Sequence, residues 1–348
     1  MQKLRKNIII VFGFQIFVFS FLLMPLYAQA QAVSDPLQYI VAPEVPGPNQ
    51  LVLLEVQGVG SFLGNASISW SKDGVVEKSG AGARTYSFTT KELGQPTRIR
   101  VAIQSDTNGS YSKEFIFIPS LVNLVWEADT TVPPFYRGKA LYSAGSPLKV
   151  AAFPIVFSGG LQIAPSALSY QWSHNDEPVP EASGLGHSTF SFDGDLLQTQ
   201  ETVSVDVYYG RARVARGEIA VAAVEPGILL YARDPLRGTE WNRALPAGIQ
   251  LNASEITLQA APYYFSAASF RAGQLGFNWT LEGEPVVGPS SAYGILTLRQ
   301  AGAGQGSAMV EVSAENRDSN AFTQLARQGL QIVFGQQNSS ILSSFFGL

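Results

Sequence analysis

Apolar and polar residues alternate in short runs along most of this chain. From Arg98 to Gln104, for example, the apolar residues Ile99, Val101 and Ile103 alternate with residues that are polar except for one alanine, which is the period of a half-buried strand. About seven such runs fall in each stretch of roughly 105 residues, separated by turn-forming residues, as in a β-sandwich. The pattern therefore predicts an all-β chain.

Three stretches of matching pattern indicate that one unit is repeated. Each stretch ends in a tryptophan, carries an apolar or aromatic residue two positions earlier, and is followed by a polar turn. The tryptophans are Trp70, Trp172 and Trp279, at intervals of 102 and 107 residues. This interval is the length of a small domain, so we predict that one type of domain is repeated three times in tandem. The shared period of two places the three tryptophans in equivalent cores rather than in ligand sites.

These stretches and the strand spacing resemble the tandem immunoglobulin-like modules of secreted bacterial proteins, over residues 35–335. That family buries a tryptophan on its third strand, and its bacterial members, like this chain, lack the cysteine pair. The resemblance implies an all-β fold of three tandem Ig-like β-sandwich domains, over residues 33–120, 121–226 and 227–335. Residues 35–50 contain four prolines, so we expect a lead-in or an edge segment with few ladder hydrogen bonds.

The first 32 residues have the pattern of a secretory signal peptide. Lys3, Arg5 and Lys6 form a basic start, residues 7–26 are almost wholly apolar, and small residues precede two overlapping cleavage positions, after Ala30 and Ala32. The apolar segment also approaches the lower length limit of a membrane-spanning helix, so an uncleaved anchor is the alternative. We expect an exported protein, extracellular or associated with the cell envelope, that contacts a membrane only if this segment is retained.

The composition narrows the possible partners and chemistry. Hydrophobic residues make up 46% of the chain and charged residues 14%, which argues against bulk disorder. Without the first 32 residues, 20 basic and 27 acidic residues remain, a net charge of −7 that disfavours a nucleic-acid partner. The absence of cysteine excludes disulfides and thiolate catalysis.

Candidate catalytic and metal-binding residues are sparse. The chain has two histidines, His174 and His187, and no Gly-x-Ser-x-Gly motif, so neither a serine hydrolase nor a zinc site is expected, and no cofactor is predicted. Calcium stays open because oxygen ligands are common, although turns favour the same residues. The candidate calcium ligands are Glu127, Asp129, Asp193, Asp195, Glu315, Asp318 and Asn320.

Two connecting segments share a distinctive motif. In each, an aromatic residue precedes a basic residue that is followed by Ala-Leu, and each lies in the predicted connection between the first two strands of its repeat. The residues are Tyr136, Arg137 and Lys139 in the second repeat, and Trp241 and Arg243 in the third. An exposed aromatic beside a cation is typical of a binding hot spot, and packing against a neighbouring domain is the alternative.

The last residues, 336–348, form a polar linker and an apolar tail that contains Phe345 and Phe346. The tail is a candidate docking peptide, or it folds back onto the third domain.

With no catalytic constellation, the sequence favours a non-enzymatic, exported structural or interaction protein that presents Ig-like modules for adhesion or envelope assembly. Its partner is then a protein or a surface glycan. The alternative is a carbohydrate-binding or accessory module of a secreted polysaccharide-active enzyme.

Overall fold

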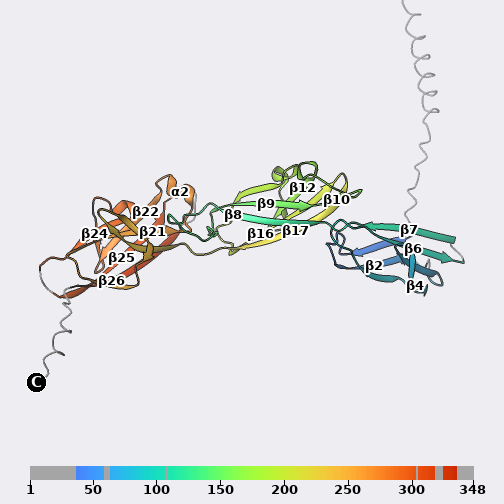
Figure 1. Cartoon of the computed structure of the whole chain (residues 1–348), viewed down its shortest axis with the longest axis horizontal. Coiled ribbons are helices and arrows are strands. Elements are labelled where there is room, and N and C mark those ends of the chain that lie inside the picture. The colour runs from blue at the N-terminus through green and yellow to red at the C-terminus, as the bar shows by residue number, and fades with distance from the viewer. Residues whose placement is uncertain (1–36, 59–62, 107–108, 303–304, 318–323, 335–348) are drawn as a thin grey trace, which may run out of the picture.

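The computed structural model describes residues 37–58, 63–106, 109–302, 305–317 and 324–334. The predicted signal segment, Phe345 and Phe346 lie outside these residues. The described chain is built mainly of strands, which form three successive groups along the long axis of the molecule (Figure 1). In each group, two sheets enclose hydrophobic residues, as the alternating pattern predicted. The all-β, Ig-like sandwich fold is therefore confirmed.

The first sandwich contains β1 to β7. One sheet has the order β1-β2-β5 and the other β4-β3-β6-β7, and all pairs are antiparallel. The strands are β1 (Leu37–Ala42), β2 (Leu51–Gly58), β3 (Ser67–Lys72), β4 (Val75–Ala81), β5 (Thr85–Thr89), β6 (Thr97–Ser105) and β7 (Gly109–Phe117). β1 is an edge strand of its sheet, which was one of the two expectations for this segment. The expectation of few ladder hydrogen bonds is wrong for β1, which pairs with β2 along its whole length, because the prolines at 43, 46 and 48 come after the strand.

The second sandwich contains β8 to β17. One sheet has the order β15-β9-β8, and the other has β12 at its centre, beside β13, β14 and β16, with β17 at the edge. The strands are β8 (Leu121–Ala128), β9 (Pro147–Ile155), β10 (Phe157–Ser158), β11 (Leu161–Gln162), β12 (Ser169–His174), β13 (Glu177–Pro178), β14 (Gly184–Leu185), β15 (Thr189–Asp193), β16 (Gln200–Tyr209) and β17 (Ala212–Ala222).

The third sandwich contains β18 to β26 and one short helix, α2 (Ala267–Arg271). Its sheets have the orders β19-β18-β21-β24 and β20-β26-β25-β22-β23, and β20 runs parallel to β26. The strands are β18 (Gly227–Asp234), β19 (Gly238–Ala244), β20 (Gly248–Leu251), β21 (Glu255–Tyr263), β22 (Leu275–Leu281), β23 (Glu284–Val286), β24 (Ile295–Arg299), β25 (Gly306–Asn316) and β26 (Leu325–Phe334). A 3₁₀ turn, Ser291–Tyr293, precedes β24.

The three tryptophans occupy equivalent places in the three sandwiches. They lie on β3, β12 and β22, and each is almost fully buried among apolar side chains. Each indole N–H donates to a carbonyl in the connection that precedes the next strand of the facing sheet, so the ring is fixed at both ends. The acceptors are Ala83 for Trp70 (2.7 Å), His187 for Trp172 (2.9 Å) and Ser291 for Trp279 (3.3 Å).

The connections between sandwiches are short. β7 ends at Phe117 and β8 begins at Leu121, while β17 ends at Ala222 and β18 begins at Gly227. The predicted domain boundaries fall in these gaps and stay predictions. In each group, one sheet contains the first strand of that group and the facing sheet contains the strand with the buried tryptophan. This is the immunoglobulin-like arrangement.

Candidate functional site

The long connection between β8 and β9, residues 129–146, leaves the second sandwich and lies against the third. Its first part binds the segment after β21 by backbone hydrogen bonds. The N–H of Thr131 donates to Phe265 O and the N–H of Tyr264 donates to Thr131 O, both at 2.7 Å. The N–H of Ala267 donates to Asp129 O at 3.0 Å. We call residues 129–146 the junction loop, because its backbone joins the two sandwiches like an added strand.

A buried glutamine fixes the end of the junction loop to the third sandwich. The side-chain amide of Gln324 donates to the hydroxyls of Ser143 (2.8 Å) and Ser146 (3.0 Å), and its carbonyl accepts from the N–H of Ser266 (2.8 Å). The Ser143 hydroxyl in turn donates to Tyr264 O at 2.5 Å. The polar groups at this contact therefore satisfy one another, which buried polar groups require.

The same loop is fixed to the second sandwich by a buried carboxylate. Glu201 on β16 accepts hydrogen bonds from the Tyr142 hydroxyl (2.9 Å), the Asn175 amide (2.9 Å) and the N–H of Asp195 (2.6 Å), and it binds the His174 ring at 2.7 Å. Burial alone would raise the pKa of this carboxyl, but these hydrogen bonds lower its pKa below the ordinary value. His174 thus has a structural partner, Glu201.

Helix α2 lies between β21 and β22. Ser266 caps it, with its side chain accepting from the N–H of Ser269, and Gly273 follows with a φ of +72°, which suits a helix C-terminus. Arg271, the last residue of this helix, faces the junction loop. The Arg271 guanidinium binds the Asp129 carboxylate with both terminal nitrogens, at 3.2 and 2.6 Å.

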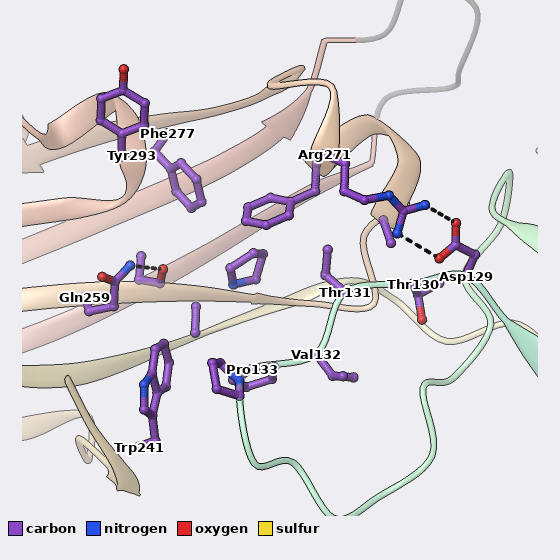
Figure 2. A pocket seen from close by; sticks show the side chains of 16 residues that line it. Asp129, Thr130, Thr131, Val132, Pro133, Trp241, Gln259, Arg271, Phe277 and Tyr293 are labelled. Atoms are coloured by element: carbon purple, nitrogen blue, oxygen red, sulfur yellow. Dashed lines mark hydrogen bonds and ion pairs between the residues drawn. The ribbon is translucent and has the colours of Figure 1, made fainter. Parts of the chain in front are cut away.

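A cavity of about 580 Å³ lies between the junction loop and the third sandwich. Figure 2 shows Trp241 and Gln259 toward one end of this junction pocket and the Asp129–Arg271 ion pair at the other. Further aromatic walls come from Phe270 on α2, from Phe277 on β22 and from Tyr293 before β24. The lining is therefore mainly aromatic and apolar, with a few polar groups, which is the usual make-up of a ligand pocket.

Beside the pocket, tyrosines from both sandwiches form a cluster. The Tyr136 and Tyr264 hydroxyls are 2.9 Å apart, and the Tyr136 ring meets the Tyr263 ring edge to face at 5.7 Å. The cluster continues from Tyr263 to Tyr231, whose ring packs against Trp241 at 5.1 Å. Burial and the Tyr136 hydroxyl raise the pKa of Tyr264 to about 12. The aromatic residues of the repeated motif thus belong to one surface.

The basic residues of the repeated motif lie outside this tyrosine cluster. Lys139 lies over the ring of Trp126 in the second sandwich, 3.1 Å from its centroid, and burial lowers the pKa of this lysine. Arg137 and Arg243 are exposed. Trp241 lies on β19 rather than in a connection, because residues 238–244 pair with β18. The expectation of a loop position for Trp241 is therefore wrong.

The calcium candidates are not gathered into one site among the described residues, where no group of three acidic or histidine side chains forms a metal-sized cluster. Asp129 binds Arg271 instead, and Asp318 and Asn320 lie outside the described residues. No sequence pattern singles out the pocket residues Phe270, Arg271 and Tyr293. The cap signal Ser266 followed by Gly273 marks α2 and was the available clue to the first two.

No protein-family model matches the sequence, and no curated protein matches it. Solved structures that match are arrays of similar modules. The three N-terminal domains of the highly immunogenic outer capsid protein of bacteriophage RB49 share 13% identity, cover 86% of this chain and 97% of theirs, and give a TM-score of 0.25. The fibronectin(III)-like modules of Clostridium thermocellum CbhA share 11% identity, with 53% and 94% covered and a TM-score of 0.26.

A third match is the Bacteroides ovatus protein SGBP-B of a mixed-linkage glucan utilization locus, in complex with a mixed-linkage heptasaccharide. It shares 10% identity, covers 85% of this chain and 70% of its own, and gives a TM-score of 0.21. With TM-scores this low, the fold assignment rests on the strand order of the chain itself. Within the described residues, no helix is long and apolar enough to cross a membrane.

Proposed function

We propose that this chain is an exported, non-enzymatic interaction protein, and that the junction pocket is where it binds its partner. The observation that carries the proposal is a concave, aromatic-lined cavity built jointly by two sandwiches whose relative position is fixed by buried hydrogen bonds. Ligand sites form preferentially at such interfaces between domains. Export is proposed from the sequence of the first 32 residues.

A binding role is favoured over catalysis by the state of the charged groups. Among the described residues that line the pocket, the charged side chains are Asp129 and Arg271, and they bind each other. The buried carboxylate of Glu201 accepts hydrogen bonds from structural partners instead of facing the cavity. General acid–base catalysis needs a titratable group within reach of a substrate, so the pocket favours recognition.

The test compares capture of envelope material by three forms of the full chain, purified after export and immobilised. The wild type and Phe153→Ala, whose ring is exposed on β9 away from the pocket, are expected to retain envelope protein or polysaccharide. Trp241→Ala is expected to retain at least tenfold less. Equal capture by all three forms would contradict the pocket as the binding site, and retention of the protein in the cytoplasm would contradict export.

The carbohydrate-binding alternative is favoured by one specific observation, the exposed aromatic rings of the pocket. In that case the chain is an accessory module that holds a glycan near other proteins.

A further inference from the structure

We propose that the junction pocket binds a neutral sugar ring of a glycan. This inference rests on the proposed function, because it takes the junction pocket to be the binding site. Three features of the pocket favour this ligand: aromatic walls, a polar end without net charge, and a central wall strand, β21, that is paired on both sides.

The aromatic walls come from separate elements and remain open to solvent. Phe270 on α2 is 48% exposed and Tyr293 is 77% exposed, while Trp241 on β19 is half-buried against Tyr231. Aromatic faces are electron-rich. The C–H bonds of a sugar ring are polarised by the neighbouring hydroxyls, so one face of the ring can stack on such a surface. A sugar ring would cover apolar area that water otherwise contacts.

The polar end of the pocket suits a neutral ligand with hydroxyl groups. Asp129 and Arg271 neutralise each other, yet their side chains are 45% and 64% exposed, so a ligand can still reach them. An ionic ligand would have to compete with this bidentate pair. A hydroxyl both donates and accepts, so it can donate to the carboxylate while accepting from the guanidinium without separating them.

Gln259 supplies a further group for a hydroxyl. Its amide nitrogen donates to Ala260 O at 3.0 Å, which orients the side chain. Its carbonyl oxygen meets Arg233 at 3.4 Å, a long contact that leaves it able to accept a second hydrogen bond. The Gln259 amide therefore lies toward one end of the aromatic walls, and the Asp129 carboxylate lies at the other end (Figure 2).

The β21 part of the pocket wall disfavours an extended peptide that would add as a strand. Strand β21, which lines the pocket, is an interior strand that pairs with β18 and β24, and Ala260 N–H donates to Gly294 O at 2.8 Å. Peptides that add to a sheet need an unpaired edge. Pro133, Pro134 and Pro262 also line the pocket and have no N–H to donate.

The junction loop holds these groups in place before a ligand arrives. Thr131 is hydrogen-bonded through its backbone to both Tyr264 and Phe265, and its hydroxyl accepts from the Phe265 N–H at 3.1 Å. A pocket that is already ordered loses less conformational entropy on binding. A small, repeated unit such as a sugar ring can then bind without rearrangement of the loop.

The experiment is affinity electrophoresis of the full chain through native gels that contain a polysaccharide. The neutral probes are xylan, galactomannan, hydroxyethyl cellulose and dextran, and the acidic probes are polygalacturonate and alginate. We expect the wild type to be retarded by at least one neutral probe and by neither acidic probe. Trp241→Ala and Phe270→Ala should bind that probe at least tenfold more weakly, and Trp241→Tyr should recover part of the affinity.

Phe153→Ala is the matched control, because its ring is 57% exposed on β9 of the second sandwich, and it should bind like the wild type. Thermal melting of each variant checks that the sandwiches stay folded, and Phe270→Ala tests the pocket if Trp241→Ala unfolds. No retardation by a neutral probe, or equal retardation of the pocket variants, overturns the glycan proposal. If Trp241→Ala then still loses capture of envelope protein, the proposed function stands and its partner is a protein.

Discussion

Both junctions between sandwiches contain an exposed ion pair, Glu44–Arg213 at the first and Asp129–Arg271 at the second, but within the described residues the second also has a buried hydrogen-bond network around Gln324. At the first, Glu44 and Arg213 form an ion pair in which the glutamate side chain is 72% exposed, and the Phe157 ring lies against Gly94. At the second, the side chain of Gln324 is buried between the sandwiches and hydrogen-bonded on both sides. Exposed ion pairs contribute about 0–1 kcal/mol, whereas a buried polar group that loses its partner costs about 1–3 kcal/mol.

This difference arises from one connection and not from the linkers, which are short at both junctions. In the second sandwich, the connection between the first two strands spans residues 129–146 and reaches the third sandwich. In the first sandwich, the corresponding connection spans residues 43–50 and contains three prolines. We therefore expect the second and third sandwiches to behave as one body and the first to move more independently.

The largest expected effect comes from removing the carboxylate that anchors the junction loop to the second sandwich. Glu201→Gln places an amide donor opposite groups that themselves donate, so it should lower the free energy of unfolding by about 3 kcal/mol. Urea unfolding measures this change. Glu218→Gln on β17, an exposed position, should change stability by no more than about 0.5 kcal/mol. Similar losses in both variants would contradict the assigned role.

The Glu201 carboxylate should also make the stability of the protein depend on pH. Its folded pKa is lowered from the ordinary value of 4.5, so its contribution is fully present above about pH 4.5 and is lost as the pH falls through the lower folded pKa. Between neutral pH and pH 3, the wild type should lose more stability than Glu201→Gln. A parallel decline of the two proteins would argue against this contribution.

The next effect concerns the coupling of the second and third sandwiches. Gln324→Ala removes hydrogen bonds to Ser143 and Ser146 and leaves the Ser266 N–H without its acceptor, so we expect a loss of about 2–3 kcal/mol. Calorimetry should show these two sandwiches melting together in the wild type and separately in the variant. Gln331→Ala, at an exposed position of β26, should keep the joint transition. Separate transitions already in the wild type would exclude the coupling.

A smaller effect is expected at the outer edge of the same junction. Tyr136→Phe removes the hydroxyl that lies 2.9 Å from the Tyr264 hydroxyl but keeps the ring contact with Tyr263, so stability should fall by about 0.5–1 kcal/mol. Chemical denaturation that follows the unfolding of the second and third sandwiches measures this loss of stability. Tyr209→Phe on β16 serves as the control for loss of a partly exposed hydroxyl. An unchanged midpoint in Tyr136→Phe would mean that water replaces the bond without cost.

Much of the fold could be predicted because it depends on local periodicity. The residues two positions before the tryptophans, Ile68, Tyr170 and Phe277, are buried with them, since alternate residues of a strand face the same side. The edge strand β20 was missed, because its four residues are too short to show a period and pair with β26 far along the chain.

Only part of the candidate site could be predicted from the sequence. Tyr136 and Trp241 belong to a shared sequence motif, and the structure brings both to the third sandwich, but the motif does not predict which surface they share. Glu201 and Gln324 gave no signal, because a polar residue that is buried in a network looks in the sequence like any polar residue. A buried polar residue can be told from an exposed one only when its hydrogen-bond partners, which lie far away in the sequence, are known.

The smallest energetic effect is expected at the first junction, where the change should appear in motion and not in stability. Glu44→Gln removes an exposed ion pair with Arg213 and should change the unfolding free energy by less than about 1 kcal/mol. The chain has no cysteine, so spin labels can be placed at Val75, Leu161 and Val287, which are exposed in the three successive sandwiches. The distance distribution should be broad between the first two labels and narrow between the last two. The variant, or 1 M salt, which screens exposed charges over about 3 Å, should broaden the first distribution and leave the second unchanged. Equal widths across the two junctions in the wild type would show that the buried network adds no rigidity beyond that of an exposed ion pair.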